Sequence, residues 1–419
     1  MNWRWLAVIL LATAGCFWPS LSFPLLSDDY WLASNPLRSD TIRADLSHAS
    51  GDSFYRPAAD LAIAAEALWA GTDPLIWHAT GLLLHLINCV LIWILARRLN
   101  IVDPAASIAA GIFAVHGSRV EAVSWMGAHY DRQATFFFLC ASVLFLQYCD
   151  GRRAASITGC LLALALALFS KESAYCFPIA AILFLAISRR PLRSNILPLA
   201  AVAFVTGAAF ALRWWLQGGM GGYLDPATGR PEIWNLNAVL IAHTLLWRAW
   251  ALLFFPINWS EPPSIALLFV FAPAAILAFT RTGRRRLWCA IGLVITLLLP
   301  VLSRGLIGRD LLGSRILYLP VAGFAILLAV LLEGIAGETQ QAIIAAGLIL
   351  FFAGTLEHNL GIWGRVSRLA LRTCQETAAR PVTSLPAEID GVYFFRNGYP
   401  ECVAAQKLTG KPQSARSCW

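Results

Sequence analysis

The sequence predicts an all-helical, polytopic membrane protein with about eleven transmembrane helices, each with the roughly 20 mainly apolar residues that cross a bilayer core. Of its 419 residues, 58% are hydrophobic and only 13% are charged, whereas about a quarter of the residues in a soluble domain are charged. Many of the 17 Trp residues stand near the ends of apolar runs, where the amphipathic indole ring favours the membrane interface. Composition and pattern therefore both indicate a chain built for lipid.

The predicted spans follow one another along most of the chain. They begin near Trp5, Leu75, Pro104, Asp131, Ser156, Ser173, Ile196, Ser264, Arg286, Arg315 and Gln341. The first apolar run, from Trp5 to Leu26, could instead be a signal peptide, but it lacks an Ala-x-Ala cleavage site and continues directly into an acidic loop. We therefore expect this run to be retained as the first membrane helix.

Four clusters of arginine predict how the spans are oriented. They lie at residues 97–98, 152–153, 189–193 and 281–286, and short cytoplasmic loops carry an excess of Lys and Arg. All four are cytoplasmic if the amino terminus is cytoplasmic and residues 237–256 do not form a full span. That segment mixes histidine, arginine and tryptophan with its apolar residues, so we expect it to lie along the outer interface or to re-enter the membrane.

This topology predicts the domain organisation. Residues 1–375 form the transmembrane domain, residues 27–74 are its long first outer loop, and residues 376–419 are a short tail on the outer, periplasmic side. Three cysteines stand in or just before this tail: Cys374, Cys402 and Cys418. One disulfide can form among them in an oxidising compartment, and the sequence leaves its pairing open.

The charge pattern argues against two classes of function. The net charge of +8 falls in short clusters between apolar segments, without the continuous basic stripe of a nucleic-acid-binding protein. The halves of the chain show no repeat and no inverted pair of helices broken by Gly or Pro, which counts against a secondary transporter. We therefore expect membrane lipid, and no nucleic acid, as a partner.

Two adjacent carboxylates, Asp28 and Asp29, follow the first span directly. One of them could act as general base toward an acceptor hydroxyl, or help to hold a divalent metal such as Mg²⁺ or Mn²⁺. The alternative is a solvated loop or a helix cap. Adjacent helical residues face different directions, so we expect only one of the pair to reach the reacting atoms.

A dense polar cluster joins the third and fourth spans. It contains His116, Glu121, Asp131 and Arg132, and a carboxylate at the start of a helix is favoured by the helix dipole. In the structural alternative, Asp131 is a helix cap and Glu121 pairs with Arg119 or Arg132. Two histidines without a third suitably spaced ligand make a weak case for zinc.

Further charges interrupt the later apolar runs. Lys171 and Glu172 stand between the fifth and sixth spans, where charges at a membrane edge tend to be functional, although they could simply form a tight loop. Three arginines fall on a later outer loop: Arg304, Arg309 and Arg315. The guanidinium fork suits a phosphate or pyrophosphate group.

Three polar residues share one face of the second span, His78, His85 and Asn88. Such a face usually packs against neighbouring helices through hydrogen bonds. The alternative is direct contact with a substrate.

A series of motifs runs through the chain in a specific order. They are SDDY at 27–30, FYRP at 54–57, the run at 77–99, FAVHGSRVEAVSW at 113–125, HYDRQATFFFL at 129–139, LFSKES at 168–173 and SRILYLPVAGF at 314–324. In this order the chain resembles the GT-C glycosyltransferases, and most closely the transmembrane O-mannosyltransferase-like family. The resemblance covers most of residues 1–375.

The resemblance implies transfer of a sugar from a polyprenyl-phosphate-linked donor to an acceptor on the outer side of the membrane. It assigns the catalytic carboxylate to Asp28 or Asp29. Donor or acceptor contacts fall on Tyr55, Arg56, His116, Glu121, Asp131, Lys171, Glu172, Arg315 and Tyr318, to which we add His85, Arg132 and Arg309 as candidates. No cofactor is certain, and a divalent metal stays a hypothesis.

Two positions and the tail depart from the family pattern. Arg119 replaces the second histidine of the motif, and His129 replaces the arginine before the aspartate. The tail is also too short for two of the roughly 34-residue tetratricopeptide repeats that follow the membrane domain in eukaryotic members. Recognition of an acceptor through such repeats is therefore not expected.

We thus predict a GT-C-like, inverting glycosyltransferase of the bacterial inner membrane, with a cytoplasmic amino terminus and a protein, lipid or glycan acceptor. Two other functions remain open from the sequence. The same arginines and apolar groove could serve a flippase or transporter of lipid-linked saccharide, or the chain could be a non-catalytic envelope scaffold whose tail binds a partner.

Overall fold

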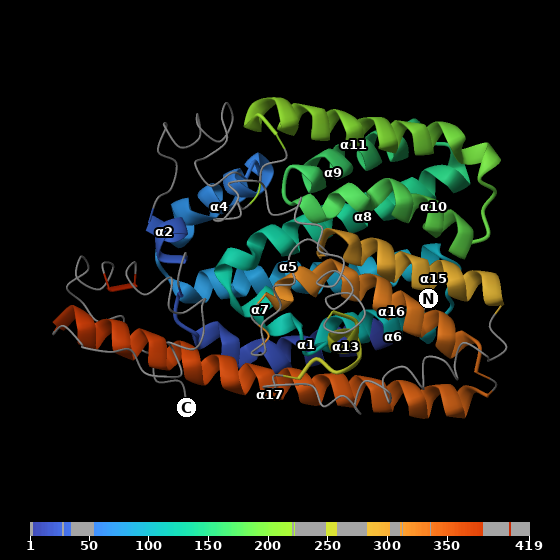
Figure 1. The fold of residues 1–419 in the computed structure, drawn as a ribbon. Helices are drawn as coiled ribbons and strands as arrows, with labels where there is room; N and C mark the ends of the chain where they lie inside the picture. The colour runs from blue at the N-terminus through green and yellow to red at the C-terminus, as the bar shows by residue number, and fades with distance from the viewer. Residues whose placement is uncertain are drawn as a thin grey trace.

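The computed structural model describes residues 3–26, 29–34, 54–219, 222, 249–257, 283–301, 311, 313–335, 337–379 and 402–403. Within these ranges every regular element is a helix, as predicted. Ten helices pack along one another in Figure 1: α1 (Trp3–Phe17), α5 (Pro74–Arg98), α6 (Ala105–Val115), α8 (His129–Gly151), α9 (Ala154–Leu168), α10 (Phe177–Ile187), α11 (Ile196–Gln217), α15 (Arg284–Leu298), α16 (Tyr318–Glu333) and α17 (Glu338–Ala379).

These helices begin within a few residues of ten predicted spans. The span predicted near Ser264 lies outside the described residues. Six of the described helical stretches are long and apolar enough to cross a membrane, by length and composition. The chain is therefore a multi-pass membrane protein.

Local sequence signals set the ends of the longest central helices. Pro74 occupies the first turn of α5, and the Asp73 carboxylate caps this helix by accepting a hydrogen bond of 2.9 Å from the Leu75 N–H. Arg97 and Arg98 stand in its last turn, where cations are favoured by the helix dipole. Helix α8 ends where Arg152 takes a left-handed conformation, with φ of 52°.

The core of the bundle is built around α16. Its most apolar window is 89% buried, whereas the corresponding windows of α11 and α17 are 28% and 22% buried. Helices α11 and α17 run along opposite faces of the bundle (Figure 1). Gly323 brings α16 against α15, because a Cβ there would stand only 2.9 Å from the Leu297 side chain. Helix α16 therefore forms the centre, while α11 and α17 present apolar surface outward.

All four predicted arginine clusters meet at one end of the bundle, which we call the arginine end. Arg98 and Arg190 both bind Asp150, at 3.4 Å and 2.7 Å. The Arg286 guanidinium donates to the Leu99 carbonyl at 3.2 Å. Arg152 donates to Asn195 Oδ1 at 2.9 Å. The expectation that the clusters share one side is thus confirmed for their described residues.

Short helices gather at the other end, which we call the loop end. They are α2 (Asp29–Ser34), α4 (Pro57–Ala70), α7 (Arg119–Ser124), η2 (Met126–Ala128), η3 (Glu172–Cys176) and η8 (Ser314–Leu317). Helices α2 and α4 come from the predicted first outer loop and lie together at the left of Figure 1. The loop end therefore collects polar segments that are far apart in the sequence.

Helix α11 ends at the loop end, and helix α15 begins at the arginine end. Of the segment at 237–256, only residues 249–256 are described, and they contain the five-residue helix α13 (Trp250–Phe254). Helix α17 continues past the predicted boundary at 375. Near its end, Cys374 forms a disulfide with Cys402, which resolves the pairing among the described cysteines.

Candidate active site

Seven charged side chains meet at the loop end, and we call them the charged cluster. They are Arg56, Glu121, Asp131, Lys171, Glu172, Arg213 and Arg315. They come from α7, α8, α11, η3, η8 and the segments that precede α4 and η3. Charges this close to membrane helices are costly unless they are paired or used.

Glu172 lies between two arginines. Its Oε2 is 2.5 Å from Arg56 Nη2, and its Oε1 is 2.6 Å from Arg213 Nη1. The Arg56 guanidinium also lies over the Phe54 ring, 4.1 Å from its centroid. Burial is the largest single influence on the pKa of Arg56 and lowers it, but the charge and hydrogen bond of Glu172, together with Tyr130 and Asp131, raise that pKa above its ordinary value. Arg56 therefore stays cationic, and Glu172 fixes the direction of both guanidinium groups.

Lys171 precedes Glu172 and points to another carboxylate. Its ammonium is 2.5 Å from Asp131 Oδ2, and only 15% of the Lys171 side chain is exposed. Burial is the largest influence and lowers the pKa of Lys171 to about 8; Asp131 opposes this change, whereas the charges of Arg56 and Arg315 add to it. Lys171 is thus a cation that titrates slightly above neutral pH.

Glu121 is bound by the turn before α16. Its carboxylate accepts hydrogen bonds from the backbone N–H groups of Gly313 and Arg315, at 3.1 Å and 2.8 Å, and from Arg315 Nη1 at 2.5 Å. The Arg315 guanidinium also lies over the Trp125 ring at 4.7 Å. Glu121 therefore pairs with Arg315, not with Arg119 or Arg132 as the structural alternative supposed.

Arg315 links the two halves of the cluster, because its Nε is also 4.0 Å from Asp131 Oδ2. The cluster holds four cations against three carboxylates, which leaves one positive charge in excess among its members. Ion pairs that are mostly screened from water interact strongly and hold their geometry. Such an arrangement is suited to binding a group that carries negative charge.

Asp29 stands beside the cluster at the start of α2. Its carboxylate is 1% exposed and accepts backbone hydrogen bonds from Leu26 at 2.9 Å and from Gly127 at 3.0 Å. Gly127 belongs to η2, between the helices that carry Glu121 and Asp131. Asp29 thus joins the predicted first outer loop to the segment between Glu121 and Asp131. Asp28 and Arg309 lie outside the described residues.

Four other candidates lie inside the helix bundle: His85, His116, Arg132 and Tyr318. His85 Nε2 donates to the Ala114 carbonyl at 3.0 Å, so its Nδ1 accepts from the Tyr318 hydroxyl at 2.7 Å. This contact, and the bond of 3.1 Å from Asn88 to the Arg132 carbonyl, confirm that the polar face of the second span packs against neighbouring helices.

His116 and Arg132 likewise bind main-chain carbonyls. His116 Nε2 donates to Leu253 at 2.9 Å, and burial lowers the pKa of His116 to about 3. Arg132 Nη1 donates to the Trp125 carbonyl at 3.0 Å. Both side chains hold the segments around α7 in place and are not members of the charged cluster.

Tyr55 is buried next to Arg56, with its ring edge-on to Phe169 at 6.1 Å. Burial raises the pKa of Tyr55, so its hydroxyl is neutral near physiological pH. The Tyr55 ring therefore packs against the residue that ends α9.

Sequence reasoning missed Arg213 and a second polar group around Glu66. Arg213 lies in the otherwise apolar α11, and an arginine inside such a helix is the signal that could have revealed it. Glu66 of α4 accepts a hydrogen bond from Thr80 and lies 3.6 Å from His129. Burial raises the pKa of Glu66.

No group of three or more His, Cys, Asp or Glu side chains that could hold a metal ion occurs within the described part of the chain. A role for Mg²⁺ or Mn²⁺ at Asp28 or Asp29 remains a hypothesis.

A family model and a solved structure are similar to this chain. The family model described as dolichyl-phosphate-mannose-protein mannosyltransferase matches residues 74–214. The structure of ArnT from Cupriavidus metallidurans bound to undecaprenyl phosphate aligns with 99% of this chain and 89% of its own, with a TM-score of 0.51 and 14% identity. The predicted GT-C fold is confirmed. Five of the seven members of the charged cluster lie within the part of this chain that the family model matches.

Two relatives are similar to part of this chain. Protein O-mannosyl-transferase Tmtc1 of Drosophila melanogaster is 26% identical over 141 residues, which is 34% of this chain and 16% of that protein. Protein O-mannosyl-transferase TMTC1 of Mus musculus is 30% identical over 158 residues, with the same two shares. The similarity thus spans about a sixth of the length of these relatives.

Proposed function

We propose that this chain is an inverting GT-C glycosyltransferase of a bacterial inner membrane. It transfers a sugar from a polyprenyl-phosphate-linked donor to a protein, lipid or glycan acceptor on the periplasmic side. The observation that carries the proposal is the charged cluster, with its excess positive charge at one end of helices long enough to cross a membrane. The apolar outer faces of α11 and α17 suit the polyprenyl chain of the donor.

The charged cluster and a carboxylate of the predicted first outer loop together provide what the proposed reaction needs. Asp28 or Asp29 takes the proton from the acceptor hydroxyl, whose oxygen forms a bond to the anomeric carbon of the sugar. The bond between that carbon and the donor phosphate oxygen breaks, and the electron pair leaves with the lipid phosphate. Arg56, Lys171 and Arg315 stabilise the negative charge that develops on the departing phosphate, because they are fixed before the reaction begins.

Sugar transfer by the full chain tests this proposal. The chain is reconstituted in liposomes with undecaprenyl-phosphate-mannose and candidate acceptors, and release of undecaprenyl phosphate is measured. We expect Asp28→Asn or Asp29→Asn to lower transfer at least about 100-fold, because a positioned general base contributes that much. The matched control is Asp73→Asn, because Asp73 caps α5 outside the cluster.

Thermal unfolding of each variant is measured alongside. Asn at position 29 would turn an amide N–H₂ toward a backbone N–H donor, which also costs stability. Unchanged transfer in both variants would overturn the mechanism. Movement of intact donor across the bilayer without release of lipid phosphate would instead support a flippase.

A further inference from the structure

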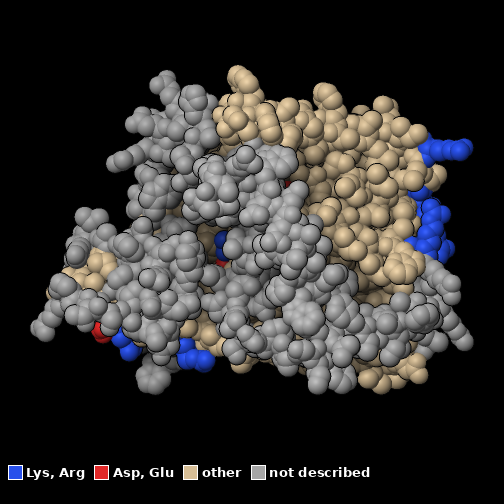
Figure 2. Space-filling view, in the orientation of Figure 1, with Lys and Arg blue, Asp and Glu red and all other residues tan. Residues whose placement is uncertain are grey.

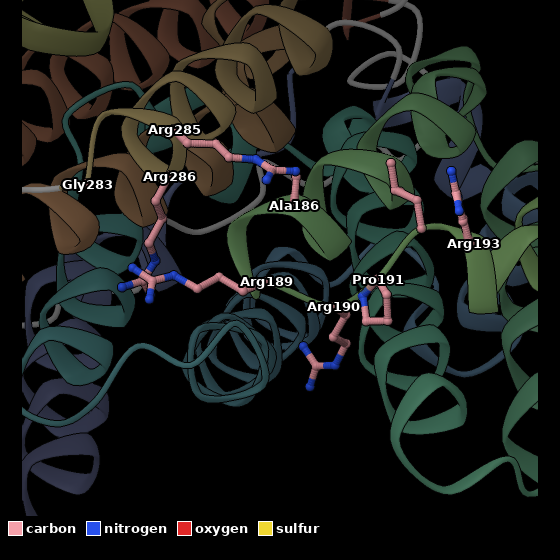
Figure 3. A pocket seen from close by; sticks show the side chains of 9 residues that line it. Ala186, Arg189, Arg190, Pro191, Arg193, Gly283, Arg285 and Arg286 are labelled. Atoms are coloured by element: carbon pink, nitrogen blue, oxygen red, sulfur yellow. The ribbon is translucent and has the colours of Figure 1, made fainter.

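A cavity at the arginine end has no part in the proposed reaction. It has a volume of about 780 Å³ and lies between the end of α10, the start of α11 and the start of α15. Its lining consists of Ala186, Arg189, Arg190, Pro191, Leu192, Arg193, Gly283, Arg285 and Arg286 (Figure 3). Figure 2 shows Lys and Arg side chains gathered at the corresponding edge of the molecule. The lining contains five arginines and no acidic side chain.

Two of these arginines are anchored by carboxylates behind the cavity. Arg190 binds Asp150 through two hydrogen bonds, at 2.7 Å and 2.9 Å. Arg286 binds Glu333 at 2.7 Å. These pairs fix the ends of α8, α10, α15 and α16 relative to one another. The cavity therefore has a rigid, polar wall.

The other three arginines have no acidic partner among the described residues: Arg189, Arg193 and Arg285. All three are exposed. The Arg189 guanidinium lies beside Gly283 at the start of α15, 3.7 Å from where a Cβ would stand. Figure 3 shows Arg189 beside Arg286, Arg285 pointing toward Ala186, and Arg193 on the other side of the cavity. Guanidinium groups that line one cavity repel one another, and an oxyanion bound in the cavity reduces that repulsion. Phosphate oxygens match the guanidinium fork best.

Exposed apolar side chains continue from the cavity along α11. Leu192 in the lining is 42% exposed, and Ile196 and Leu197 in the first turn of α11 are 62% and 76% exposed. Phosphate-binding arginines thus adjoin a surface suited to acyl chains. A soluble phosphate compound would not contact this apolar surface. A phospholipid would, because its phosphate would lie at the arginines while its acyl chains covered the apolar side chains.

The cavity is separate from the charged cluster. Position 213 lies about 26 Å along α11 from its first residue, at 1.5 Å per residue, which is close to the roughly 30 Å thickness of a bilayer core. The cluster and the cavity thus stand at opposite ends of membrane-length helices.

We propose that this cavity binds the phosphate headgroup of an anionic phospholipid from the leaflet at the arginine end. Arg189 and Arg285 contact the phosphate oxygens, Arg193 adds positive charge on the other side of the cavity, and the acyl chains lie along the start of α11.

Native mass spectrometry of the full-length protein tests this proposal, with phosphatidylglycerol as the probe and phosphatidylcholine as the zwitterionic reference. Loss of one charged hydrogen-bond donor should weaken binding of phosphatidylglycerol about tenfold in Arg189→Gln and in Arg285→Gln. The matched control is Arg153→Gln, because Arg153 is an exposed arginine at the same end that does not line the cavity. This variant should bind phosphatidylglycerol as the unaltered chain does.

Inorganic phosphate and glycerol 3-phosphate are added as soluble competitors. If the lipid is the ligand, neither should displace phosphatidylglycerol. Displacement by either compound, or equal loss of binding in Arg153→Gln, would overturn the proposal: the first outcome indicates a site for soluble phosphate, and the second indicates general attraction to an anionic surface.

Discussion

The lowered pKa of Lys171 predicts the direction in which the rate of the proposed reaction changes with pH. Its pKa is lowered to about 8, chiefly by burial, so its ammonium carries charge below that pH and loses it above. We expect the transfer rate to fall as pH rises through about 8, because the departing phosphate and Asp131 both lose a cation. The rate is measured from neutral pH to about pH 9.

Lys171→Arg provides the matched test, because an arginine keeps its charge over this range. In that variant the loss of rate should move to higher pH, even if the rate itself is lower. If the transfer rate fell at the same alkaline pH in Lys171→Arg and in the unaltered chain, a group other than Lys171 would be responsible for the pH dependence.

The sequence predicted which residues belong to the candidate site better than it predicted which groups those residues bind. Glu121, Asp131, Lys171, Glu172 and Arg315 meet in one cluster as expected, because each follows or precedes an apolar run at the same end of the bundle. The sequence could not show that Glu121 binds the turn before α16, since this contact joins residues almost 200 positions apart. For the same reason it offered no means of separating His85 and His116, which bind main-chain carbonyls, from the residues of the cluster.

The long helices were predictable at the scale of elements, because apolar runs of membrane length have few alternatives to a helix. The short helices α4 and α7 were not, since their sequences are only partly apolar and their ends depend on contacts with α5 and α8. Helix α7 carries Glu121, and the first turn of α4 holds the main chain of Arg56, whose carbonyl accepts a hydrogen bond of 3.0 Å from the Ala59 N–H. The part of the site that loops supply was therefore the least predictable.

The packing of α15 against α16 depends on Gly323. A methyl group at this position would stand 2.9 Å from the Leu297 side chain and 3.4 Å from the Val294 backbone. We expect Gly323→Ala to destabilise the bundle by about 1–3 kcal/mol, because inserted atoms strain a filled core. Thermal unfolding in detergent measures the change.

Gly207→Ala is the control for this substitution, since a Cβ at position 207 of α11 meets nothing within 4 Å. That variant should unfold at the same temperature as the unaltered chain or slightly higher. Equal destabilisation by both substitutions would show that close approach of α15 to α16 is not the cause.

At the scale of the whole molecule, the two ends of the bundle should lie on opposite sides of the membrane. An introduced cysteine at Arg285 should be labelled by an impermeant thiol reagent only from the cytoplasm, and one at Asp73 only from the periplasm. The unaltered chain gives the background from its native cysteines. If position 285 were labelled from the periplasm, the orientation of the bundle would be the opposite of the predicted one. The charged cluster would then lie on the cytoplasmic side.

The central claim is that the charged cluster stabilises a lipid phosphate as it leaves the sugar. Arg213 tests it most directly, because the structure, and not the sequence, assigns this arginine to the cluster through its ion pair with Glu172. We predict that Arg213→Gln lowers single-turnover transfer from undecaprenyl-phosphate-mannose at least about tenfold, whereas Arg153→Gln at the arginine end leaves the rate unchanged. Equal rates in Arg213→Gln and the unaltered chain would contradict the account.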